Sequence, residues 1–171
     1  MLQVFALIAF FGSIVWAGFM VPDYPWRHLD DPAHLTVLGT PLMILAMIGV
    51  RAFGIVRRWD SARAERILFA VFLAAMPSVY ILSSVLAGAW NHLPVEVAGQ
   101  VLFAALAVLG LRSSPWFLAV GILGHGVGWD LWHRGQAGSV PTWYADTCLI
   151  LDVGFSLYAA AQVERWKTKA R

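Results

Sequence analysis

Two histidines and an aspartate lie close together in the stretch 125–133, whose other residues are apolar, aromatic or glycine. His125, Asp130 and His133 are followed in a second apolar run by Asp152. Ionisable side chains are costly inside hydrocarbon, so within an apolar run they indicate a functional site by default. Imidazole and carboxylate groups that face each other are suited to general acid–base catalysis near neutral pH. We therefore predict catalytic roles for these four residues.

The helical period places the first group of side chains on one side of its helix. At about 100° per residue, His125, Trp129 and His133 fall on one stripe, and Asp130 lies about 60° beyond His133. The two histidines are about 12 Å apart along the helix axis, which is too far for both to bind one metal ion. Asp130 and His133 are close enough along the helix to share a ligand or an ion.

The following helix carries a second polar stripe, on which Tyr144 and Asp152 lie two turns apart. A short connector joins the two helices, so they should be antiparallel neighbours. We expect a His125–Asp152 pair near the middle of the bilayer. Nearer the outer side we expect a group formed by Asp130, His133 and Tyr144.

The leading functional prediction is a membrane enzyme that acts by acid–base chemistry on a lipid or isoprenoid-like apolar substrate. Asp130 or Asp152 would be the general acid or base, with His125 or His133 as its partner. Aromatic faces can stabilise positive charge that develops on such a substrate. The residues expected to bind the substrate are Trp129, Trp132, Trp143, Tyr144, His92 and Glu96.

Three alternatives use the same residue types. A metal-dependent hydrolase would take Asp130, His133, Asp152 and His92 as ligands; these residues suit zinc, although they form no compact ligand motif. A proton-coupled carrier would use the histidines and aspartates as a relay. A structural role would make them contacts between helices, but such contacts contribute only about 0.6 kcal/mol on average. The leading prediction needs no cofactor, whereas the hydrolase would need zinc.

The composition indicates an integral membrane protein. Of the 171 residues, 60% are hydrophobic and 13% are charged, and the mean hydropathy is +0.69, whereas soluble domains carry about 25% charged residues. The net charge of +2 does not indicate nucleic-acid binding, because the basic residues lie in short connectors between apolar runs. The single cysteine, Cys148, excludes a disulfide framework within the chain. The expected partners are the membrane and an apolar small molecule, and a homo-oligomer stays open.

Apolar runs separated by polar connectors predict an all-α bundle of six transmembrane helices in one domain. Each span needs about 20 apolar residues. Pro77 falls inside the third span and should kink it. The spans are expected at about residues 2–20, 35–56, 67–89, 95–111, 116–133 and 142–163.

The arginine and lysine residues predict the orientation of the bundle. With six spans, ten of the twelve basic residues fall on one side, and only Arg27 and Arg134 fall on the other. Positive residues concentrate in cytoplasmic loops, so both termini should be cytoplasmic. All the histidines except His125 then lie at or near the outer boundary. We expect an apolar substrate to reach the site from the outer leaflet.

One part of the sequence resembles a known group of proteins. It consists of the run Gly128-Trp129-Asp130-Leu131-Trp132-His133, with His125 before it and Cys148 and Asp152 after it. It resembles a group of small bacterial integral membrane proteins of uncharacterised activity with a His-x-x-Trp-Asp-x-x-His-His signature. In those proteins a Cys-x-x-x-Asp-like element follows in the next helix. The likeness covers roughly residues 118–158; here the first histidine is one residue further from the tryptophan, and Arg134 replaces the last histidine. The resemblance implies a bacterial inner membrane and names no activity.

Overall fold

All the regular secondary structure in the described part of the chain is helical. The computed structural model describes residues 61–135, 140 and 142–168, and no strand occurs among them, which confirms the predicted helical class for this part. The predicted spans at 2–20 and 35–56 lie outside the described residues. In chain order the helices are α4 (Ser61–Ala75), α5 (Ser78–Leu86), α6 (Leu93–Arg112), α7 (Trp116–Gly124), the π-helix η3 (His125–Asp130), α8 (Leu131–Gly135) and α9 (Thr142–Thr168).

Two helical stretches are long and apolar enough to cross a bilayer. One is Ala62–Val85, with 24 residues and a mean hydropathy of 2.0, and the other is Leu93–Arg112, with 20 residues and a mean hydropathy of 1.8. Crossing a hydrocarbon core about 30 Å thick takes about 20 helical residues. The two stretches correspond to the third and fourth predicted spans.

The break between α4 and α5 lies at Pro77, where the sequence predicts a kink. Proline has no backbone N–H, so it cannot donate to the carbonyl one turn earlier. The helix restarts at once, because the Pro77 carbonyl accepts a hydrogen bond from the Tyr80 N–H at 3.1 Å. From α6, the side-chain amide of Gln100 donates to the Ala74 carbonyl beside the break at 2.6 Å. The kink thus fixes Tyr80 in the first turn of α5.

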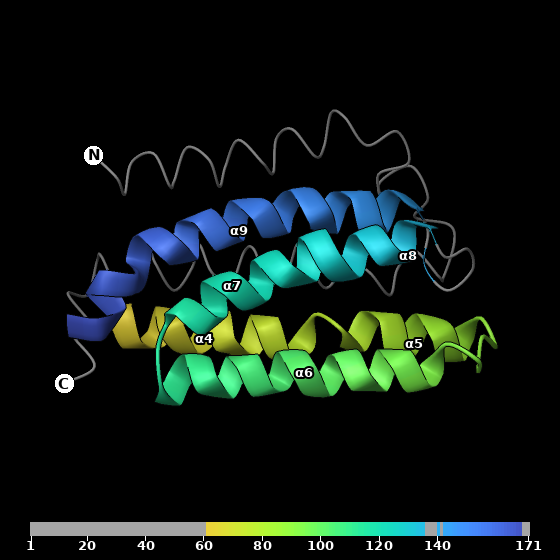
Figure 1. Ribbon diagram of the computed structural model, residues 1–171, viewed down its shortest axis with the longest axis horizontal. Helices are drawn as coiled ribbons and strands as arrows, with labels where there is room; N and C mark the ends of the chain where they lie inside the picture. The colour runs from red at the N-terminus through yellow and green to blue at the C-terminus, as the bar shows by residue number, and fades with distance from the viewer. Residues whose placement is uncertain (1–60, 136–139, 141, 169–171) are drawn as a thin grey trace.

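The helices form two layers (Figure 1). In one layer α9 runs beside α7 and α8, and in the other α6 runs beside α4 and α5. Glycines let the layers approach closely, since a Cβ added at Gly110 of α6 would collide with Leu118 of α7. A Cβ at Gly121 of α7 would likewise lie 2.6 Å from the Leu73 side chain of α4. Small residues at helix crossings are the usual means of close packing between membrane helices.

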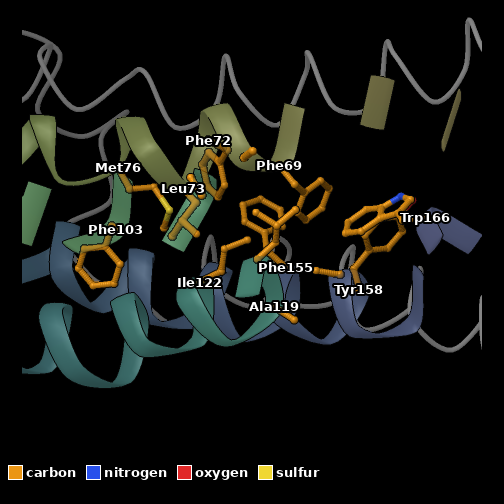
Figure 2. Close-up of a cluster of buried hydrophobic side chains, with 14 of the residues drawn as sticks. Phe69, Phe72, Leu73, Met76, Phe103, Ala119, Ile122, Phe155, Tyr158 and Trp166 are labelled. Atoms are coloured by element: carbon orange, nitrogen blue, oxygen red, sulfur yellow. The ribbon is translucent and has the colours of Figure 1, made fainter. Parts of the chain in front are cut away.

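Aromatic side chains of α4 and α9 form the core between the layers (Figure 2). Phe72 packs edge-on against Phe155, with ring centroids 5.0 Å apart. Phe69 stacks on Tyr158 at 5.6 Å and lies 5.2 Å from the ring of Trp166. Aromatic pairs at these separations contribute about 0.5–1.5 kcal/mol beyond the area they bury. The cluster holds α4 against the C-terminal half of α9.

A buried carboxylate joins the same two helices near the start of α4. Glu65 is only 3% exposed. Its carboxylate accepts hydrogen bonds from the Tyr158 hydroxyl and, at 3.1 Å, from the Trp166 indole N–H, and it forms an ion pair with Arg165. No local sequence pattern indicates this group, because two of these partners lie 93 and 101 residues further along the chain.

Replacing Glu65 by alanine should destabilise the bundle. The change removes the acceptor shared by three side chains of α9, and removing one partner of a buried ion pair costs about 3–5 kcal/mol. The matched control is Glu164→Ala, which removes an exposed carboxylate of α9 and should cost less than about 1 kcal/mol. Thermal unfolding in detergent, followed by far-ultraviolet circular dichroism, measures both changes. Equal losses in the two variants would contradict the structural role of Glu65.

Candidate functional site

The helix that carries the predicted site changes its winding at the site itself. α7 ends at Gly124, the π-helix η3 spans His125–Asp130, and α8 continues from Leu131. The backbone bonds of a π-helix join residues five apart, so His125 and Asp130 come to lie above one another. In a regular α-helix the same two residues would diverge by about 140°. The expectation that Asp130 lies away from the His125 stripe is therefore wrong, and the π-helical turn is the reason.

Four side chains form one buried group, hereafter the His125 cluster: Tyr80, His125, Asp130 and Asp152. His125 Nδ1 lies 2.8 Å from Asp152 Oδ2 and 3.5 Å from Asp130 Oδ1. The Tyr80 hydroxyl donates a hydrogen bond to Asp130 Oδ1. Each of the four residues is at most 1% exposed. The predicted His125–Asp152 pair is confirmed, and Asp130 approaches the same imidazole nitrogen.

A second buried group, hereafter the Glu96–His133 pair, joins α6 to α8. Nε2 of His133 lies 2.8 Å from Oε1 of Glu96, and both side chains are nearly free of solvent exposure. Glu96 stands in the first turn of α6, where a carboxylate also complements the helix dipole. The contact with His133 spans 37 residues of sequence, so no local pattern indicates it.

The hydrogen bonds of His133 determine where its protons lie. A backbone carbonyl can only accept, so His133 Nδ1 carries a hydrogen and donates it to the Trp129 carbonyl at 2.8 Å. The 2.8 Å contact between Nε2 and Glu96 then needs one further proton, held by either the imidazole or the carboxyl group. The His133 imidazole and the Glu96 carboxyl group therefore share one proton in a buried hydrogen bond.

Tyr80 connects the two buried groups. Its hydroxyl binds Asp130, while its ring lies 3.9 Å from the His133 ring at an angle of 35°. The expected group of Asp130, His133 and Tyr144 is wrong in its pairing, because Tyr80 binds Asp130 and Glu96 binds His133. Tyr144 instead packs edge-on against Tyr80 at 5.8 Å. One feature of the sequence could have indicated a role for Tyr80: its phenol follows Pro77 by three residues inside an apolar span.

Four buried polar atoms of these groups have no hydrogen-bond partner within the described part of the chain. They are His125 Nε2, Asp130 Oδ2, Glu96 Oε2 and Trp129 Nε1. Buried polar atoms in folded proteins are nearly always hydrogen-bonded to protein or to ordered water. These four atoms are therefore the ones available to a substrate, an ion or a water molecule.

Three predicted substrate-binding side chains lie beside the Glu96–His133 pair. The ring of Trp129 is 5.3 Å from that of His133, and the ring of Trp132 is 4.6 Å from it. His92 packs edge-on against Trp132 at 6.5 Å. Trp129 lies directly on Gly99 of α6, where an added Cβ would collide with the indole. The three side chains therefore lie together beside this pair, and their role in binding a substrate stays a prediction.

The remaining predicted substrate-binding residues lie beside the His125 cluster. Trp143 and Tyr144 pack against each other at 5.9 Å and are 5% and 4% exposed. They form a small buried cluster with Tyr80 and Cys148. Cys148 is 5% exposed, as expected of a small apolar residue. The predicted site residues from α6 to α9 are therefore brought together around two adjoining groups.

The structure changes the residues that could hold a metal ion. The metal alternative predicts Asp130, His133, Asp152 and His92 as ligands. One ligand atom each from His125, Asp130 and Asp152 lies within 4.8 Å of the others. His133 has a carboxylate partner of its own, and His92 lies against a tryptophan. The two aspartates are thus grouped with the histidine that the metal alternative left out.

Comparisons with protein-family models, curated proteins and solved structures found no match to this chain. The resemblance to small bacterial membrane proteins stays a prediction from sequence.

Gly126→Ala should disturb the site, whereas alanine at the neighbouring glycines should not. A Cβ at Gly126 would lie 2.8 Å from the Cβ of Asp152, but at Gly124 or Gly128 it would meet nothing within 4 Å. Overpacking of this kind costs about 1–3 kcal/mol, and alanine in an open helical position is more favourable than glycine by about 1 kcal/mol. Melting temperatures of the three variants in detergent test this. A Gly126 variant as stable as the other two would show that η3 and α9 do not approach so closely.

Proposed function

We propose that the chain is a multi-pass membrane protein of a bacterial inner membrane, with six spans and both termini in the cytoplasm. Large apolar side chains are exposed on several helices: Val101 is 64% exposed, Val120 60% and Leu157 54%. The carboxylates and imidazoles of both site groups are buried between the helices instead. Exposed apolar side chains around a buried ionisable interior suit a lipid environment.

The ends of the helices support this orientation. Arg66, near the start of α4, donates to the carbonyls of Gly110 and Leu111 at the end of α6, each at 3.0 Å. The basic ends of these two helices therefore lie together, as expected for a cytoplasmic side. Glu96 lies early in α6 and His133 late in α8, so their pair is near the opposite ends. This supports a site in the outer half of the bilayer.

Acid–base catalysis is the function that the site supports best. The observation that carries it is a pair of buried imidazole–carboxylate contacts, His125–Asp152 and His133–Glu96, each at 2.8 Å. An imidazole that contacts a carboxylate is an arrangement suited to passing a proton to or from a substrate. In a site closed to water the proton is passed to the substrate without loss to solvent. Polar contacts between membrane helices stabilise a protein by only about 0.6 kcal/mol on average. Stability alone is therefore a weak explanation for two buried imidazole–carboxylate pairs.

The surroundings of the two groups favour an apolar substrate. Phe103 lies 5.1 Å from the His125 ring, and Trp129 lies beside both Phe103 and His133. Aromatic faces attract positive charge, such as the charge formed when a double bond is protonated. A lipid or isoprenoid-like molecule, isomerised, cyclised or cleaved by proton transfer, fits these features. It would enter from the outer leaflet, because the Glu96–His133 pair lies near the outer ends of its helices.

Reporter fusions test the proposed topology. A fluorescent protein at the C-terminus should be bright, and alkaline phosphatase at the same point should be inactive, because the basic tail holds that end in the cytoplasm. Alkaline phosphatase inserted between residues 136 and 139 should be active, since the proposed topology assigns this connector to the outer side. An inactive phosphatase in the connector, in a stable and membrane-inserted fusion, would reject the orientation.

Asp152→Asn and Glu96→Gln should each lower product formation by about 10²–10⁴-fold, the usual contribution of general acid–base catalysis. Both changes keep the shape of the side chain but remove the group that shares a proton with histidine. Mass spectrometry of lipid extracts, comparing cells that express the chain with cells that carry an empty vector, identifies the product. The variants are then measured for the same product.

The matched control is Asp146→Asn, which changes a partly exposed aspartate of α9 that pairs with Arg134. This variant should form product at the level of the unchanged protein. Equal product from all three variants would reject acid–base catalysis at the two groups. Uptake of a solute into liposomes that depends on pH, without conversion of the solute, would identify a proton-coupled carrier instead.

A further inference from the structure

Two carboxylates and an imidazole converge at the closest approach of η3 and α9. We propose that His125, Asp130 and Asp152 bind one divalent transition-metal ion such as Zn²⁺. The ligand atoms would be Nδ1 of the histidine and one oxygen of each aspartate. This inference deepens the proposed function and rests on it, since it adds an ion to the same site.

The separations between the ligand atoms fit such an ion. His125 Nδ1 lies 2.8 Å from Asp152 Oδ2 and 3.5 Å from Asp130 Oδ1. Zinc bonds to nitrogen and oxygen of about 2.0–2.2 Å, with angles between 90° and 109°, place neighbouring ligand atoms about 2.8–3.6 Å apart. Both measured distances fall in this interval. The third separation, between one oxygen of each aspartate, is within 4.8 Å.

The carboxylates of the cluster also favour the binding of a cation. Asp130 and Asp152 are 0% and 1% exposed. No arginine or lysine of the described residues forms an ion pair with either of them; Arg134 pairs with Asp146 and Arg165 with Glu65. When both are ionised, two buried carboxylates facing one imidazole carry a net negative charge, which costs several kcal/mol in an apolar interior. A divalent ion with a neutral imidazole balances both carboxylates.

The groups around the cluster resemble the outer shell of a metal site. Ligating carboxylates are usually oriented by a hydrogen bond from a further residue, and the Tyr80 hydroxyl donates one to Asp130. Asp130 Oδ1, the oxygen near His125, keeps a second lone pair beside the hydrogen bond from Tyr80, and Asp130 Oδ2 is buried with no partner within the described residues. Three protein ligands are the set found in catalytic zinc sites, in which the substrate or a water molecule completes the coordination.

With an ion bound, the His125 cluster and the Glu96–His133 pair would have different roles in the reaction. At the His125 cluster it would polarise an oxygen of the substrate as a Lewis acid. Proton transfer would then fall to the Glu96–His133 pair, which holds one exchangeable proton between two groups. Tyr80 touches both groups, so a substrate bound at one would lie next to the other.

Metal analysis of the full chain tests the proposal. The chain is purified in detergent without an immobilised-metal column, and its zinc, manganese and iron contents are measured by mass spectrometry. It is then stripped with a chelator and titrated with Zn²⁺ or Mn²⁺ while its melting temperature is followed. We expect one ion per chain and a rise in melting temperature that saturates at that ratio. An unchanged melting temperature with both ions, together with a metal-free purified chain, would overturn the proposal.

Variants separate this inference from the proposed function. Asp130→Asn and Asp152→Asn should each lower the bound metal at least tenfold while the helical circular dichroism stays the same. Glu96→Gln is the matched control, because it alters the neighbouring carboxylate, and it should keep the metal while losing product. Metal retained in both aspartate variants would reject the ligand set. Metal binding with full product formation in the Glu96 variant would reject only the acid–base role of that pair.

Discussion

The close approach of η3 and α9 is the constraint on which the rest of the site depends. His125 reaches Asp152 at 2.8 Å, and Gly126 places no side chain between the two helices at that point. In the proposed membrane location, helices would gain little from apolar burial against each other, because lipid is equally apolar, so close packing and polar contacts would decide how they pair. Gly126 therefore allows the two helices to approach, and His125 bonds to Asp152 across the contact.

Two departures from regular α-helix bring the side chains of the candidate site within reach of one another. The break at Pro77 starts a new helix whose first turn carries Tyr80, and the π-helical turn brings Asp130 onto the face of His125. Irregular helix is costly in an apolar environment unless neighbouring groups satisfy the freed backbone. Gln100 does so beside the proline. Both irregularities thus serve the same buried cluster.

The four buried carboxylates of the described residues differ in what balances them. Glu65 is paired with Arg165, whose guanidinium stays charged, so this group is suited to holding α4 against α9. Glu96, Asp130 and Asp152 face imidazole or phenol groups, which can exchange protons. The Glu65–Arg165 ion pair therefore lies towards one end of the bundle, and the carboxylates that face imidazole or phenol groups lie towards the other end.

The sequence alone determined the helical class of the described part, the break at Pro77 and the pairing of His125 with Asp152. These follow from local apolar patterns and from a short connector that makes two helices neighbours. The tertiary structure decided that Glu96 binds His133 and that Tyr80 binds Asp130, across 37 and 50 residues. It also decided the π-helical turn, which a period of 3.6 residues does not anticipate. The physical reason is that local periodicity sets which side of a helix a residue occupies, whereas the packing of distant helices sets what it meets there.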